Sequence, residues 1–82
     1  MIQATIAIYP LGNEDFRAIH RAIDALRAGG VELDVRAMHT ELRGEPNAVF
    51  AAIRAAYDAA AAEGGVVMTV SVSNVCPLPG EG

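Results

Sequence analysis

The chain has 82 residues, a formal net charge of −4 at pH 7, and hydrophobic residues at 52% of its positions. That length provides for one domain with one core, and ten acidic residues against six basic ones argue against nucleic-acid binding, which depends on cations that neutralise phosphates. A core this small is marginally stable by itself, so the apolar content favours burial against another copy. A homodimer or higher homo-oligomer is therefore expected.

The sequence predicts a cytoplasmic protein without membrane insertion. The apolar run over residues 66–72 is far too short to span a bilayer, and no basic segment precedes a long apolar one near the N-terminus. Cys76 is the single cysteine, so no internal disulfide can form, and it has no metal-ligand spacing around it. Neither a metal nor a cofactor is expected.

The first half of the chain predicts a strand, a helix and a second strand. Apolar and other residues alternate over 2–9, which is typical of a strand covered on one face. A helix is expected over 15–28, with Asn13 or Asp15 as its N-terminal cap. Alternation returns over 31–36. The apolar stripe of the helix consists of Phe16, Ile19, Ile23 and Leu26.

The second half predicts a strand, a helix and a final strand. The third strand is expected over about 39–43, and Gly44 and Pro46 separate it from a helix that reaches residue 62 through an alanine run. The final strand, over 66–74, has the strongest alternation. The face that the second helix turns to the core is expected to carry Val49, Ile53, Tyr57 and Ala60, with Phe50 beside it.

The order of elements is therefore β-α-β-β-α-β. It predicts an α+β protein, a ferredoxin-like (ACT-like) βαββαβ sandwich in which a four-stranded antiparallel sheet carries two helices on one face. Residues 1–76 form the expected ligand-binding domain, and residues 77–82 are expected to be a flexible C-terminal tail.

The sheet face that the helices leave uncovered is predicted to be polar. This face is either a solvated or dimer-packed surface, or a shallow site whose short polar groups fix a heteroaromatic ring. Its residues are Gln3, Thr5, Ala7 and Tyr9 from the first strand, Thr69, Ser71 and Ser73 from the last, and Glu32, Asp34, Arg36, His39, Glu41 and Arg43 from the middle pair.

Several segments together resemble the YkoF-type thiamine/hydroxymethylpyrimidine-binding family, and they run in order across nearly the whole chain. His39 departs from the family's pattern, in which a small residue is expected there. The segments are QATIAIYPLG at 3–12, MHT at 38–40 with Gly44, Val49-Phe50, and VMTVSVSNVCP at 67–77.

The resemblance implies a single-domain protein that binds thiamine or its hydroxymethylpyrimidine half without catalysis, in thiamine transport, salvage or regulation. Some members carry two such domains in tandem, which implies a homodimer here. The Gln3 amide can donate to and accept from an aminopyrimidine edge, and Tyr9 can stack on the ring. The expected ligand-binding residues are Gln3, Tyr9, Thr40, Ser73 and Asn74.

Two other functions stay open at this point. One is an ACT-like regulatory module that binds an amino acid, and the other is a pure oligomerisation domain. No catalytic residue is expected, because the chain has neither a glycine-rich phosphate loop nor a nucleophile elbow. An amino-acid sensor ignores thiamine, and an oligomerisation domain responds to no small molecule.

Overall fold

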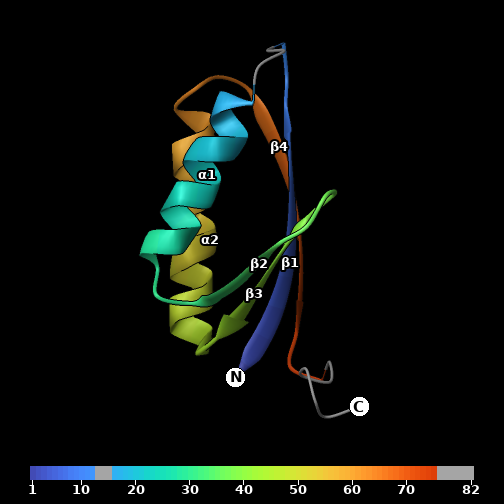
Figure 1. Ribbon diagram of the computed structural model, residues 1–82, viewed down its shortest axis with the longest axis vertical. Coiled ribbons are helices and arrows are strands. Elements are labelled where there is room, and N and C mark those ends of the chain that lie inside the picture. The colour runs from blue at the N-terminus through green and yellow to red at the C-terminus, as the bar shows by residue number, and fades with distance from the viewer. Residues whose placement is uncertain (13–15, 76–82) are drawn as a thin grey trace.

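The computed structural model describes residues 1–12 and 16–75, and these form a sheet with two helices packed on one of its faces (Figure 1). The order of elements is the predicted one. Their bounds are β1 (Ile2–Pro10), α1 (Arg17–Ala28), β2 (Glu32–Val35), β3 (Thr40–Gly44), α2 (Pro46–Ala61) and β4 (Val66–Ser73).

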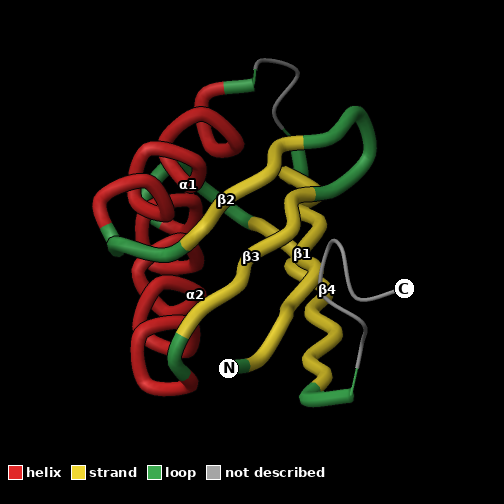
Figure 2. The backbone as a smooth tube through the Cα atoms, turned by 60° about the horizontal axis from the view of Figure 1, so that its bottom comes forward, coloured by secondary structure: helices red, strands yellow, loops and turns green. Residues whose placement is uncertain are grey.

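The four strands form one antiparallel sheet in the order β2-β3-β1-β4, with β1 in its interior (Figure 2). β1 pairs with β3 from Ile2 opposite Gly44 as far as Ile6 opposite Thr40. On its other side β1 pairs with β4 over a longer stretch, which ends at Pro10 opposite Val66. This topology confirms the predicted ferredoxin-like fold.

The predicted boundaries differ from the observed ones by at most two residues. β1 includes Pro10, which occupies the last ladder position, and β2 is shorter than the alternation over 31–36 indicates. α1 begins at Arg17, and the two predicted caps Asn13 and Asp15 lie outside the described residues. Gly30, with a φ of 72°, makes the left-handed turn that leads from α1 into β2.

The core contacts of both helices are made largely by alanine. Phe16 and Tyr57 belong to the predicted apolar stripes but not to these core contacts. Phe16 is 65% exposed and Tyr57 is 46% exposed. The helices approach so closely that a Cβ atom on Gly29 would lie 3.0 Å from the Cβ atom of Ala52. Larger side chains are thereby displaced to the flanks of the helix pair. The buried helical residues are Ala18, Ala22, Leu26, Val49, Ala52, Ala56 and Ala60.

The predicted boundary between domain and tail lies outside the described residues. Those residues end at Val75, directly after a bend in which the Val75 N–H donates to the Ser73 hydroxyl at 3.0 Å. Cys76 and the predicted tail over 77–82 are likewise outside them.

We predict that Ala56→Leu destabilises the protein, because Ala56 is fully buried and the added carbon atoms have no space to occupy. The expected loss is about 1–3 kcal/mol in the free energy of unfolding, measured by urea denaturation. The control is Ala55→Leu at an exposed position of the same helix, where a change within about 0.5 kcal/mol is expected. Equal losses in the two variants would contradict the alanine-packed interface.

Candidate functional site

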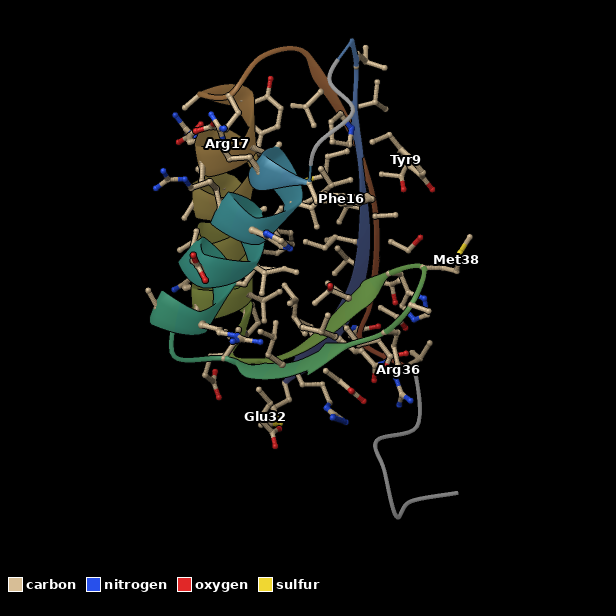
Figure 3. The ribbon with its side chains drawn as sticks, turned by 45° about the horizontal axis from the view of Figure 1, so that its top comes forward. Tyr9, Phe16, Arg17, Glu32, Arg36 and Met38 are labelled. Carbon is tan, nitrogen blue, oxygen red and sulfur yellow. The ribbon has the colours of Figure 1, made fainter. Side chains whose placement is uncertain are left out.

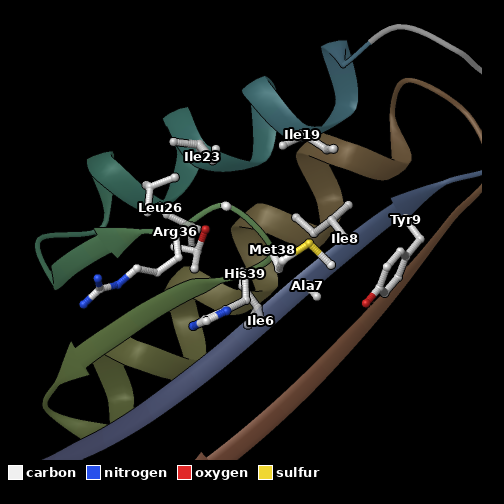
Figure 4. Close-up of a pocket in the computed structure, with 13 residues that line it drawn as sticks. Ile6, Ala7, Ile8, Tyr9, Ile19, Ile23, Leu26, Arg36, Met38 and His39 are labelled. Carbon is white, nitrogen blue, oxygen red and sulfur yellow. The ribbon is translucent and has the colours of Figure 1, made fainter.

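A pocket of about 240 Å³ lies between α1, the second half of β1 and the loop that joins β2 to β3 (Figure 4). Its walls are mainly aliphatic, and Ile8 from β1 lies opposite Ile19 and Ile23 from α1. The complete lining is Ile6, Ala7, Ile8, Tyr9, Ile19, Ile23, Leu26, Val35, Arg36, Ala37, Met38, His39 and Thr40.

The pocket exists because β1 is longer than the strand beside it. The β1–β3 ladder ends at the pair Ile6 and Thr40, whereas the β1–β4 ladder continues to Pro10. Past Ile6 the edge of β1 therefore faces the β2–β3 loop, residues 36–39, instead of a strand. The space between this edge and the loop forms the mouth of the pocket.

The main chain of Ile8 is directed into this mouth. The Leu11 N–H donates to the Gly65 carbonyl at 2.9 Å, and hydrogen-bonded pairs alternate with non-hydrogen-bonded pairs along an antiparallel ladder. Continuing that alternation, Ala7 and Tyr9 direct their main-chain groups toward β4, and Ile8 directs its N–H and C=O toward the β3 side. One donor and one acceptor thus lie side by side at the opening.

Thr40 adds a hydroxyl at the inner end of the mouth. It is the first residue of β3, lies opposite Ile6 on the helix-facing side of the sheet, and is only 7% exposed. Because a hydroxyl both donates and accepts, Thr40 complements either kind of polar atom on a ligand. The pocket therefore combines aliphatic walls with a few convergent polar groups.

The polar side chains at the rim form one salt bridge and one hydrogen bond between side chains. Arg36 contacts Asp34 at 2.7 Å, and His39 Nε2 lies 3.0 Å from Glu41 Oε2. A carboxylate only accepts, so Nε2 carries the proton of that hydrogen bond. The Arg36–Asp34 salt bridge pairs opposite charges beside the mouth, and the His39 imidazole binds the Glu41 carboxylate.

The hydrogen bond from His39 lowers the pKa of the Glu41 carboxyl below its ordinary value. Partial loss of hydration acts in the opposite direction, and the positive charges of Arg36 and Arg43 add to the lowering. Glu41 therefore stays ionised at neutral pH and holds the imidazole at the rim.

Two of the predicted site residues, Tyr9 and Thr40, line this pocket. Successive side chains of a strand point to opposite faces, so Ile8 lies against α1 while the Tyr9 ring lies on the other side of β1 (Figure 4). Tyr9 and Met38 both project from the sheet on the side away from the helices (Figure 3), and they are 52% and 83% exposed. Together they form the outer rim.

The other three predicted residues lie at the opposite end of the sheet. Gln3 is paired with Ser73 across β1 and β4, and Asn74 follows directly after β4. The Ser73 hydroxyl already accepts a hydrogen bond from the Val75 N–H. Tyr9 lies six positions after Gln3 on β1, which corresponds to roughly 20 Å of extended strand. The five residues therefore form two groups, one at each end of β1.

Sequence reasoning missed the contributions of Ile8, Ile19, Ile23 and Met38. The spacing of the α1 isoleucines places them in the core stripe. The Ile8 contribution comes from main-chain atoms, which no residue type in a sequence identifies. The available signal was the unequal length of two paired strands, nine residues in β1 against five in β3. Such a difference leaves part of one strand edge without a neighbour.

Metal binding and membrane spanning find no support within residues 1–12 and 16–75. No group of three or more His, Cys, Asp or Glu side chains in that part of the chain is placed to hold a metal ion. Neither of the two helices described is long and apolar enough to cross a membrane.

The sequence model of the YKOF-related family matches residues 1–79 of the chain. No curated protein matches it. Among solved structures, a domain of unknown function (DUF77) from Bacillus cereus superposes with a TM-score of 0.78 and 20% identity, covering 88% of this chain and 73% of that one. A hypothetical protein from Methanocaldococcus jannaschii gives 0.82 and 21%, covering 89% and 78%.

A third structure is a putative thiamine biosynthesis/salvage protein from Thermotoga maritima. Its TM-score is 0.75 at 20% identity, with 88% of this chain and 81% of that chain covered. At these identities the structural likenesses establish the fold.

We predict that His39→Ala raises the pKa of the Glu41 carboxyl toward its ordinary value, because the variant removes the hydrogen bond that lowers it. The measurement is an NMR titration of the Glu41 side chain in both proteins. His20→Ala is the matched control, since His20 lies on the exposed side of α1 and should leave Glu41 unchanged. An identical Glu41 titration in wild type and His39→Ala would show that the rim pair does not form.

Proposed function

The chain belongs to the YKOF-related family, and from that membership we propose that it is a non-catalytic protein that binds thiamine or its hydroxymethylpyrimidine half. The observation that carries the proposal is the aliphatic pocket at the open edge of β1, with the Ile8 main chain and the Thr40 hydroxyl at its mouth. A role in thiamine transport, salvage or regulation requires such binding and no chemical step.

The size of the pocket selects one half of the ligand. Sites for drug-sized molecules commonly measure about 300–1,000 Å³, and this pocket of about 240 Å³ is smaller. A single heteroaromatic ring fits it better than the whole of thiamine. The pyrimidine enters, and the positively charged thiazolium stays outside the aliphatic walls, where its charge keeps its hydration.

The polar groups at the mouth match the edge of an aminopyrimidine. That edge carries an amino donor beside a ring-nitrogen acceptor, and the Ile8 C=O and N–H offer the complementary acceptor and donor. Thr40 supplies one further hydrogen bond from the inner end of the mouth. Ile19 and Ile23 line the wall that the ring faces, and Met38 and Tyr9 lie at the rim, beside the part of the ligand that remains outside.

Thiamine, hydroxymethylpyrimidine and a panel of amino acids are compared as ligands by thermal unfolding and by titration calorimetry. A ligand at 100 times its dissociation constant stabilises the folded state by about 2.7 kcal/mol, which raises the midpoint of a domain this small by about 10 °C or more. We expect this shift with the two pyrimidine compounds. A shift with an amino acid only would favour the regulatory function, and no shift at all would favour an oligomerisation domain.

Thr40→Val should weaken binding of hydroxymethylpyrimidine about 2- to 10-fold, because it removes one hydrogen bond while keeping the shape of the side chain. The control is Gln3→Ala at the other group of predicted residues, which should leave the dissociation constant unchanged. Calorimetry measures both values. Weaker binding in Gln3→Ala with wild-type binding in Thr40→Val would move the ligand to the end of the sheet that holds Ser73 and Asn74.

A further inference from the structure

His39 is held at the rim of the pocket through both its main chain and its side chain. The Arg36 N–H donates to the His39 carbonyl at 2.8 Å, across the turn formed by Ala37 and Met38. The imidazole Nε2 donates to Glu41 Oε2 at 3.0 Å, and the side chain is 35% exposed. The ring therefore has a defined position where the pocket opens to solvent.

The Glu41 carboxylate determines which ring nitrogen of His39 carries the proton. The hydrogen bond from His39 lowers the pKa of this carboxyl, so Glu41 is ionised and only accepts. In a neutral imidazole one nitrogen donates and the other accepts, and here Nε2 is the donor. Nδ1 is then the acceptor, and no residue within 1–12 and 16–75 donates to it. One lone pair at the rim is thus available to a ligand.

The other polar side chains of the lining do not offer an equivalent acceptor. The Arg36 guanidinium only donates, and it contacts Asp34 at 2.7 Å. Thr40 lies at the inner end of the mouth and is 7% exposed. Tyr9 presents a phenol, whose oxygen is a much weaker base than an imidazole nitrogen. Nδ1 of His39 is therefore the strongest acceptor among the side chains at the outer end of the pocket.

The ligand of the proposed function, on which this inference rests, places a hydroxyl at that outer end. The amino group and ring nitrogen that face the Ile8 main chain are flanked by a methyl group on one side and a hydroxymethyl group on the other. The methyl group fits against Ile23 and Leu26 inside the pocket, where a hydroxyl would be buried among aliphatic side chains. The hydroxymethyl group is therefore directed to the rim.

We propose that His39 is a specificity-determining residue whose Nδ1 accepts a hydrogen bond from the hydroxymethyl O–H of the ligand. Glu41 is the positioning residue, because it holds the proton on Nε2 and so leaves Nδ1 bare. In thiamine the same methylene carbon carries the thiazolium nitrogen instead of the hydroxyl, and this hydrogen bond is lost. The site accordingly prefers free hydroxymethylpyrimidine to thiamine.

Two ligands that differ only in the hydroxyl test this hydrogen bond. Hydroxymethylpyrimidine is compared with its analogue that carries a methyl group in place of the hydroxymethyl group. Titration calorimetry is performed at about pH 8, above the range in which histidine ordinarily changes its charge. The wild-type protein should bind the hydroxymethyl compound about 2- to 10-fold more tightly than the analogue.

His39→Phe keeps a planar ring at the rim and removes both nitrogens, so this preference should fall to one or below. The matched control is His20→Phe, which removes an exposed imidazole from α1 and should keep the wild-type preference. Circular dichroism verifies that both variants are folded.

Glu41→Gln tests the positioning role, because an amide both donates and accepts and no longer confines the proton to Nε2. The preference for the hydroxymethyl compound should decrease. Nitrogen NMR of the His39 ring, recorded without ligand, should show the proton on Nε2 in the wild type and on both nitrogens in exchange in Glu41→Gln. The control is Asp34→Asn, the same change in the acid that pairs with Arg36, and it should alter neither measurement.

Three results would overturn the proposal: equal affinity of the wild type for the two ligands, an unchanged preference in His39→Phe, or a neutral wild-type ring with its proton on Nδ1. Binding of neither ligand would contradict the proposed function as well. Binding of both with equal affinity would leave the proposed function in place and remove only the role of His39.

Discussion

β1 forms ladders with two strands of different length, and this inequality determines most of the features described above. Its hydrogen bonds to β3 end at Ile6, while those to β4 continue to Pro10. Past Ile6 the main-chain N–H and C=O groups on this edge of β1 have no β3 residue opposite them. The loop after β2 lies beside them without forming a ladder. The mouth of the pocket, the direction of the Ile8 main chain and the position of Thr40 all follow from where that first ladder stops.

The second determinant is the close contact between the two helices. Alanine at the helix interface lets α1 and α2 approach until Gly29 and Ala52 are in contact distance of each other. Larger apolar side chains then lie to either side of that contact. On α1 Ile19 and Ile23 become pocket walls, and on α2 Phe50 and Tyr57 remain about half exposed. The close contact of the helices thus accounts both for the pocket walls on α1 and for the exposed aromatic side chains on α2.

The sequence was sufficient for the order of elements and the faces of the strands, because period-two alternation and paired glycines are local signals. It was insufficient for the helix faces, since Phe16 and Tyr57 fit a helical stripe by spacing and only the interhelical distance excludes them. Thr40 and Tyr9 were identified as candidate site residues, but their separation from Gln3 depends on where each lies along β1. The Ile8 contribution is made by backbone atoms, which every residue possesses.

A recognition edge made of main chain has an evolutionary consequence. Substitutions at Ile8 change the wall of the pocket but leave its N–H and C=O in place, so this part of the site can persist while side chains drift. An insertion or deletion of one residue in the first half of β1 has the opposite effect. Along the rest of the strand, the residues whose N–H and C=O faced β4 would then face the β3 side, and the reverse. Selection at this edge should therefore act on the spacing of β1 more strictly than on its residue identities.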